Sequence, residues 1–182
     1  HRRAQQLHAV DVGALALDVF RTHVDHAFQA VAGADGGGGH AVLAGTGLGD
    51  DARLAHAARQ QGLADPARAC IAGASYGGYA AMMGLVRNRE LFKCGINWVG
   101  VTDLDLLYTA RWSDFSNLWR EYGMPVLVGD RETDARQFAE TSPVKQAAKI
   151  TQPVLMAYGD ADRRVPIAHG YALKKAIEAH NR

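Results

Sequence analysis

Residues 73–79 read Gly-Ala-Ser-Tyr-Gly-Gly-Tyr, a spacing that suits nucleophilic catalysis by Ser75. An apolar run at 69–72 precedes the motif, and a helix-forming run at 80–83 follows it. Gly-x-Ser-x-Gly between a strand and a helix is typical of a nucleophile elbow, whose tight turn lifts the serine hydroxyl clear of the sheet. We therefore expect Ser75 to be a nucleophile and the backbone N–H of Tyr76 to be an oxyanion donor.

A candidate acid follows another apolar run, residues 154–158, which reads as a buried strand. Asp160 and Asp162 come directly after it, and in parallel sheets the chemistry gathers at the carboxyl ends of the strands. A serine followed later by an aspartate is also the chain order of α/β-hydrolases. The aspartate of such a site fixes the tautomer of the catalytic histidine and stabilises the imidazolium. Asp162 is the predicted acid, and Asp160 is its rival.

The elements that would position these residues alternate between strand and helix. Asp65-Pro66 marks a turn, and Ser142-Pro143 has the form of a helix start. The aromatic-rich residues 103–125 read as short helices or a cap. The expected strands are 69–73, 94–101 and 154–158, and the expected helices are 76–87, 143–148 and 166–180. This alternation predicts the α/β class, with a mostly parallel sheet and helices on both faces.

The composition changes abruptly near residue 62. Residues 1–64 contain no Lys, Glu, Ser or Ile, yet they hold most of the histidines. We therefore divide the chain into residues 1–61, an uncertain segment, and residues 62–182. With 182 residues the chain is long enough for one domain with a sizeable core.

Three interpretations of residues 1–61 stay open. A low-complexity linker is one, although the segment is rich in Val, Leu and Phe. An amphipathic helix is another, because Val12, Leu15, Val19 and Phe20 suit one helical face. The third is that the segment is not native protein sequence, as when a GC-rich gene is read in the wrong frame.

Several classes of partner and cofactor are disfavoured. A net charge of +1 gives no basic field for nucleic acid, and no run approaches the ~18 apolar residues of a membrane span. His23 and His26 have helical spacing, but no carboxylate or thiolate cluster completes a shell, so we expect no metal. Cys70 and Cys94 lie in apolar runs, where we expect free, buried thiols.

Four motifs, taken in order, resemble the catalytic domain of prolyl oligopeptidase-type serine peptidases, with the dipeptidyl-peptidase and acylaminoacyl-peptidase branches nearest. They are the elbow at 73–79, Leu-Phe-Lys-Cys-Gly at 91–95, Ser-Pro at 142–143 and Gly-x-x-Asp-x-x-Val-Pro at 159–166. The resemblance covers residues 62–182 and implies a partial α/β-hydrolase domain, incomplete at both ends. It also implies hydrolysis of short peptides through an acyl-enzyme on Ser75, with no cofactor. The Gly-x-x-Asp register favours Asp162 over Asp160 as the triad acid.

Two of the chain's departures from the family pattern concern the catalytic groups. The triad histidine of the family follows one more strand, which would place it beyond residue 182. His169 and His180 fall in the helix before that strand, so we expect both on the helix surface rather than in the role of base. The family takes a second oxyanion donor from an upstream tyrosine, and no tyrosine precedes Tyr76 here.

The resemblance favours a serine peptidase acting on peptides, although this piece alone is expected to be inactive. Two alternatives stay open: an esterase on the same fold, and a degenerate, non-catalytic module that only binds. Val101, Leu104 and Leu107 follow the second predicted strand and are candidates for the pocket of the residue before the scissile bond. Ordinary core packing is an equally open interpretation of those three residues.

Overall fold

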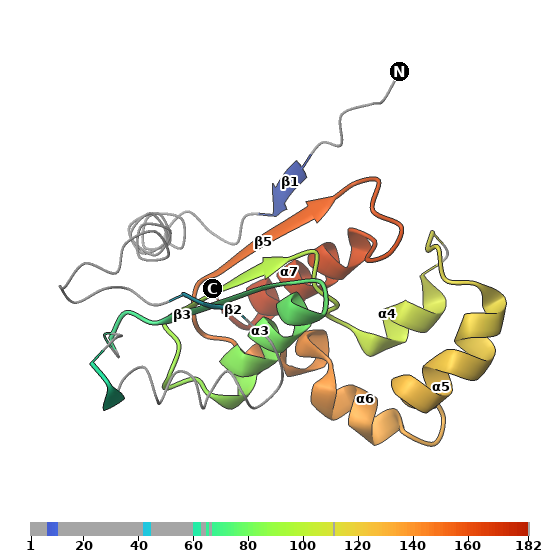
Figure 1. Cartoon of the computed structure of the whole chain (residues 1–182), viewed down its shortest axis with the longest axis horizontal. Coiled ribbons are helices and arrows are strands. Elements are labelled where there is room, and N and C mark those ends of the chain that lie inside the picture. Colours follow the sequence, from blue (N-terminus) through green and yellow to red (C-terminus); the bar gives the residue numbers. More distant parts are fainter. Residues whose placement is uncertain are drawn as a thin grey trace.

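The centre of the molecule is a five-stranded sheet with the order β1-β5-β4-β3-β2 (Figure 1). The structure is a computed structural model that describes residues 60–62, 65, 67–110 and 112–181, together with the backbone of 7–10 and 42–44. Strands β2 to β5 run parallel to one another, and β1 pairs antiparallel with β5. The strands are β1 (Leu7–Val10), β2 (Val42–Ala44), β3 (Cys70–Ala74), β4 (Cys94–Trp98) and β5 (Val154–Gly159).

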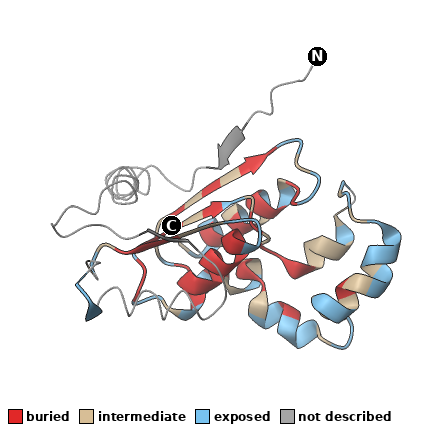
Figure 2. Cartoon of the chain, in the orientation of Figure 1, coloured by how far each residue is buried: buried red, intermediate tan, exposed pale blue. Residues whose placement is uncertain are grey.

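Two long helices pack on this sheet, α3 (Tyr76–Arg87) against β3 and β4, and α7 (Ala168–His180) against β5. The 3-10 helix η2 (Pro143–Lys149) contacts both of them. Figure 2 shows the buried residues gathered in β3, β4 and β5 and in the helices behind them. The core includes Ile71, Met82, Leu85, Phe92, Met156, Tyr158, Leu173 and Ile177. The α/β class and the mostly parallel sheet are therefore confirmed.

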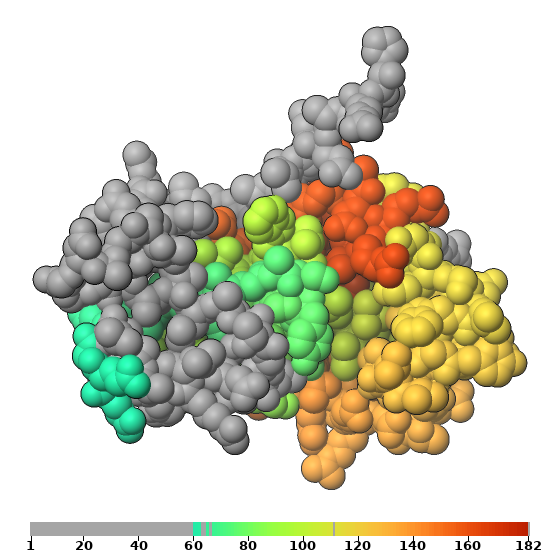
Figure 3. Space-filling model, viewed as in Figure 1, coloured from blue at the N-terminus to red at the C-terminus, as the bar shows by residue number. Residues whose placement is uncertain are grey.

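Four short helices form a lobe beside the sheet. They are α4 (Leu104–Thr109), η1 (Trp119–Gly123), α5 (Met124–Leu127) and α6 (Ala135–Thr141). In the space-filling view this part of the chain, coloured yellow to orange, gathers at one side of the molecule (Figure 3). The short helices expected within 103–125 are present, whereas α6 was not predicted. No helix among the described residues is long and apolar enough to span a membrane.

The second predicted strand ends earlier than the apolar sequence suggested, at Trp98 rather than at Val101. Val99 has φ +46°, which no β-strand accommodates and which is rare for a β-branched residue. The chain therefore leaves the sheet in a sharp turn at Val99 and Gly100. By contrast, the predicted helix 76–87 has the bounds of α3.

The expectation of free thiols is wrong, because Cys70 and Cys94 form a disulfide. The two cysteines are direct partners in the register of β3 and β4, and their Cα atoms lie 4.7 Å apart. This separation lies within the usual range for a disulfide. Both residues are buried, as expected, but their pairing depends on strand register, which the sequence does not reveal.

Two expectations lie outside the described residues. They are the helical face of Val12, Leu15, Val19 and Phe20 and the spacing of His23 and His26.

Candidate active site

Ser75 lies in the turn between β3 and α3 and is exposed to solvent. Its φ of +54° is a conformation that non-glycine residues rarely adopt. The Ser75 N–H donates a hydrogen bond to the carbonyl of Trp98 on the neighbouring strand, at 2.9 Å. A β-carbon added at Gly73 would lie 2.9 Å from Cα of Gly77, so this turn requires glycine. The geometry is that of a strained strand–turn–helix elbow.

Tyr76 opens α3, so its backbone N–H is one of the first-turn donors that no carbonyl of the helix accepts from. The Tyr79 N–H, three residues further on, donates to the carbonyl of Ser75 at 3.2 Å. The N–H of Tyr76 therefore directly follows Ser75 in the chain, at the positive end of the helix.

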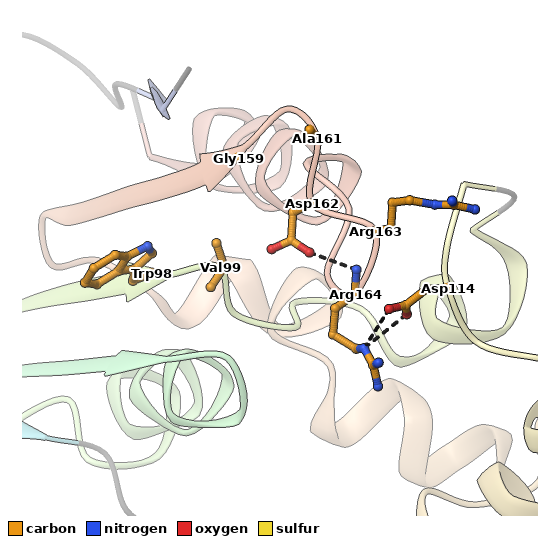
Figure 4. Close-up of a pocket in the computed structure, with 8 residues that line it drawn as sticks. All are labelled: Trp98, Val99, Asp114, Gly159, Ala161, Asp162, Arg163 and Arg164. Atoms are coloured by element: carbon orange, nitrogen blue, oxygen red, sulfur yellow. Dashed lines mark hydrogen bonds and ion pairs between the residues drawn. The ribbon is translucent and has the colours of Figure 1, made fainter. Parts of the chain in front are cut away.

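Asp162 is half-buried in the loop that follows β5. Its Oδ1 accepts the backbone N–H groups of Arg164 at 2.8 Å and Val165 at 3.0 Å. These two bonds fix the carboxylate on the wall of a cavity of about 650 Å³, which Trp98 and Val99 also line (Figure 4). The rival Asp160 is exposed and is not among the residues lining this cavity.

A second cavity, of about 560 Å³, opens beside the elbow. It brings together all the predicted residues except Asp162, namely Ser75, Tyr76, Val101, Leu104 and Leu107. The loop of Asp162 contributes Arg164 and Val165 to the same cavity, and Arg164 also lines the cavity around Asp162. The elbow and the acid loop therefore meet at one place.

The sequence did not identify the other side of the cavity around Ser75. Phe115, Trp119, Met124, Leu127 and Val128 line it from the lobe of short helices. The density of aromatic residues in 103–125 was the available signal, but it did not say which side chains face Ser75. We call Val101 and Leu104 the inner wall of the pocket, and Phe115, Trp119 and Leu127 the outer wall.

The inner wall is fastened to the core by buried hydrogen bonds. The Thr102 N–H donates to His169 Nδ1 at 3.2 Å, and the Thr102 hydroxyl donates to the His169 carbonyl at 2.6 Å. The Thr102 carbonyl accepts the N–H of Val144 at 2.9 Å. The Leu104 N–H donates to Ser142 Oγ at 3.0 Å. The segment between β4 and α4 is thus held by α7, by η2 and by the residue that caps η2.

The outer wall is joined to the acid loop by an ion pair. Arg164 Nε lies 3.0 Å from Asp114 Oδ1, and the Arg164 guanidinium stacks over the Phe115 ring at 5.1 Å. The Asp114 N–H also donates to the carbonyl of Arg163 at 2.9 Å. Because the ion pair is exposed to solvent, it fixes the outer wall relative to the acid loop more than it stabilises the fold.

His169 was expected on the helix surface, and this expectation is wrong because the residue is fully buried. Burial lowers the pKa of His169 to about 4, so the imidazole is neutral near pH 7. Its Nδ1 accepts the Thr102 N–H, which places the proton on Nε2. The spacing of apolar residues along α7 did not predict this burial, because neither His169 nor its buried neighbour Gly170 has an apolar side chain. His180 is exposed near the end of α7, as expected.

Tyr79 adds a polar group to the pocket, and its buried position raises the pKa of its hydroxyl. A hydrogen bond with Thr141 opposes that rise. Within the described part of the chain, no group of three or more His, Cys, Asp or Glu side chains could hold a metal ion.

Comparison with known proteins places this chain in a family. The profile of the prolyl oligopeptidase family matches residues 41–182, which begins inside the segment of unusual composition. Dipeptidyl aminopeptidase BIII of Pseudoxanthomonas mexicana is 32% identical over 124 residues, which cover 67% of this chain and 18% of that protein. The acylamino-acid-releasing enzyme of Arabidopsis thaliana is 26% identical over 129 residues, covering 65% of this chain and 16% of that enzyme.

Solved structures agree with the sequence relatives. A puromycin-hydrolyzing peptidase of Mycobacterium tuberculosis superposes with a TM-score of 0.62 at 26% identity, covering 73% of this chain and 19% of that one. Dipeptidyl peptidase 4 of Porphyromonas gingivalis superposes with a TM-score of 0.58 at 27% identity, and the match covers 72% of this chain and 17% of that one. The chain thus spans less than a fifth of the length of these relatives. It belongs to the prolyl oligopeptidase family of serine peptidases.

Proposed function

We propose that this chain carries the nucleophile and the acid of a serine peptidase that cleaves short peptides through an acyl-enzyme. Ser75 is the nucleophile, Asp162 is the triad acid and the N–H of Tyr76 is an oxyanion donor. The observation that carries the proposal is that Ser75 and the loop of Asp162 line one pocket, with Arg164 and Val165 beside the strained elbow.

The chemistry follows from these roles. Ser75 Oγ attacks the peptide carbonyl while a histidine takes its proton, and the Tyr76 N–H stabilises the negative oxygen of the tetrahedral intermediate. The same histidine then returns the proton to the leaving amine, and water hydrolyses the acyl-enzyme. Asp162, fixed by two backbone N–H groups, holds that histidine in one orientation.

We place the histidine outside residues 1–182. His169 is buried among core residues with Nδ1 committed to Thr102, and His180 is exposed near the far end of α7. Neither of them lines the cavity around Ser75 or the one around Asp162. The cavity beside Asp162 has a volume of about 650 Å³, which is larger than an imidazole ring needs.

The pocket favours an apolar or aromatic side chain before the scissile bond. Val101, Leu104 and Leu107 line it together with Phe115 and Trp119. One protein of similar fold is a puromycin-hydrolyzing peptidase. An apolar pocket of this kind also accepts proline, because the proline ring is apolar.

A fluorophosphonate probe applied to the natural full-length protein tests the proposal. We expect the probe to label Ser75, S75A to abolish labelling, and D162N to lower kcat by on the order of 10³ to 10⁴. D160N is the matched control and should retain activity. A folded protein whose Ser75 does not react would contradict the proposal and favour a degenerate, binding-only module.

Substrate choice separates peptidase from esterase. We expect dipeptide amides with proline or phenylalanine before the scissile bond to be cleaved with a higher kcat/KM than simple p-nitrophenyl esters of short acids. The opposite preference would favour the esterase alternative, since the same elbow serves both reactions.

A further inference from the structure

A buried polar network lies directly behind the elbow and has no part in the roles assigned above. Asn97 on β4 and Tyr158 on β5 are both fully buried. Asn97 Nδ2 donates to the Tyr158 hydroxyl at 3.0 Å, and that hydroxyl donates to the carbonyl of Gly100 at 2.6 Å. Asn97 Oδ1 accepts the N–H of Gly100 at 2.8 Å. Two side chains therefore satisfy both backbone polar groups of one glycine.

This network holds a turn that is strained. Val99, with φ +46°, stands between Asn97 and Gly100, and such a conformation costs on the order of 1–3 kcal/mol in a non-glycine residue. The Val99 N–H donates to the carbonyl of Ala157 at 2.8 Å, which ties the turn to β5. A strained turn persists only where its surroundings over-determine it. The hydrogen bonds to Gly100 do this here.

The turn at residues 98–100 supports the elbow at two points. The Ser75 N–H donates to the carbonyl of Trp98, the residue between Asn97 and Val99. The first turn of α3 also rests on it, because a β-carbon added at Gly78 would lie 2.8 Å from Cα of Gly100. A displacement of Gly100 toward α3 would therefore push against the start of that helix, and a displacement of Trp98 would change the hydrogen bond that holds the backbone of Ser75.

We propose that Asn97 and Tyr158 are positioning residues for Ser75, acting through the turn 98–100. The inference rests on the proposed function of Ser75 as nucleophile. Neither side chain lines the cavity around Ser75, so their effect is on the placement of the hydroxyl and of the Tyr76 N–H, not on substrate contact. Burial raises the pKa of Tyr158 well above its ordinary value, which keeps the hydroxyl protonated as the donor to Gly100.

The test compares the reactivity of Ser75 in variants of the natural full-length protein. Y158F removes only the hydroxyl and keeps the ring that packs against Gly170. We expect the second-order rate constant for fluorophosphonate labelling to fall about tenfold, and kcat to fall with KM nearly unchanged, because small misplacements of a reacting group are costly in rate. Y171F removes a hydroxyl from an exposed tyrosine of α7 and should label at the wild-type rate.

Asn97 supplies a graded pair. N97L removes both the acceptor and the donor in a similar volume, and we expect labelling to fall about a hundredfold. N97D keeps an acceptor for the Gly100 N–H, so its rate should lie between those of N97L and the wild type. This partial rescue distinguishes positioning from a loss of packing. If N97L does not fold, Y158F alone decides the question.

Labelling is measured at a temperature where circular dichroism shows every variant to be folded. Wild-type labelling together with an unchanged rate in Y158F would overturn this inference and leave the proposed function intact. A wild type that does not label would overturn the proposed function, and the inference with it.

Discussion

The two walls of the pocket are built by different means. The inner wall, Val101 and Leu104, comes after a strand of the core. Its backbone is held by buried hydrogen bonds from the Thr102 N–H to His169 and from the Leu104 N–H to Ser142. The outer wall lies on a lobe whose Trp119 is 42% exposed and whose Leu127 is 70% exposed. The inner wall is thus bonded to the buried core, whereas the outer wall is largely exposed to solvent. Changes on the inner side should therefore cost stability, and changes on the outer side should change selectivity.

A matched pair of glycines gives the largest expected contrast. A β-carbon in G78A would lie 2.8 Å from Cα and 3.1 Å from N of Gly100, which are backbone atoms that cannot move aside. We expect a loss of about 3 kcal/mol or more in the free energy of unfolding. In G123A the new β-carbon would lie 2.7 Å from Cζ3 of Trp119, an exposed side chain that can rotate away.

We therefore expect G123A to change the free energy of unfolding by less than about 1 kcal/mol, since alanine also favours the helix. Urea unfolding of both variants provides the measurement. Equal destabilisation by the two alanines would show that the outer wall is as constrained as the inner wall.

The pH dependence of stability should report on the anchor of the inner wall. The pKa of His169 is about 4 in the folded protein and about 6.5 in an unfolded chain. As the pH falls from 6.5 towards 4, the unfolded chain takes up a proton that the folded chain does not. Stability is thus lost over this range, by up to about 3 kcal/mol.

H169N is the control, because its amide oxygen can replace Nδ1 as the acceptor for Thr102 without titrating. Urea midpoints of the wild type and H169N are compared from pH 7 to pH 4.5, where the wild type should lose more stability. Parallel curves would mean that His169 is not buried in its neutral form.

Two serines make a smaller comparison. S142A removes the buried acceptor of the Leu104 N–H, and an unsatisfied buried donor costs about 1–2 kcal/mol. S116A removes the acceptor of the Trp119 N–H, which lies at the exposed start of η1 and can bond to water instead. We expect S116A to lower the free energy of unfolding by less than about 0.5 kcal/mol. Thermal unfolding of the two variants measures the difference, and a larger cost for S116A would reverse the comparison.

The smallest effect concerns substrate rather than stability. Leu127 lines the pocket while its neighbour Val126, 83% exposed, does not. L127A should raise KM for substrates with an aromatic side chain before the scissile bond by about fivefold, the equivalent of about 1 kcal/mol of apolar contact. V126A should leave KM unchanged, and neither variant should alter the unfolding midpoint. An unchanged KM in L127A would remove the outer wall from the substrate site.

The inner side of the site was predictable from the sequence and the outer side was not. The elbow, helix 76–87 and the loop of Asp162 depend on short-range signals: glycine spacing, an apolar run and a turn. Val101, Leu104 and Leu107 belong to the segment that leaves the carboxyl end of β4, so their place near Ser75 could be expected from the sheet. Phe115, Trp119 and Leu127 come to the same pocket only through the packing of the segment between α4 and α6, which no local pattern specifies.

The same reasoning explains the corrections at the cysteines and at His169. The Cys70–Cys94 bond depends on which residues of β3 and β4 lie opposite each other, and register is not written in either strand alone. The burial of His169 depends on the N–H and the hydroxyl of Thr102, which lie far from it in sequence. Polar residues that are buried for the sake of a distant backbone group resemble surface residues until the tertiary structure is known.

The disulfide also gives the chain a closed covalent ring, residues 70–94, that contains the whole elbow and α3. Arg89 and Glu90 form an exposed turn inside this ring. A protease that cuts there would produce two peptides that stay linked through sulfur. The nicked molecule should migrate as one species on a non-reducing gel and separate into two only after reduction, with Ser75 on the fragment that precedes the cut.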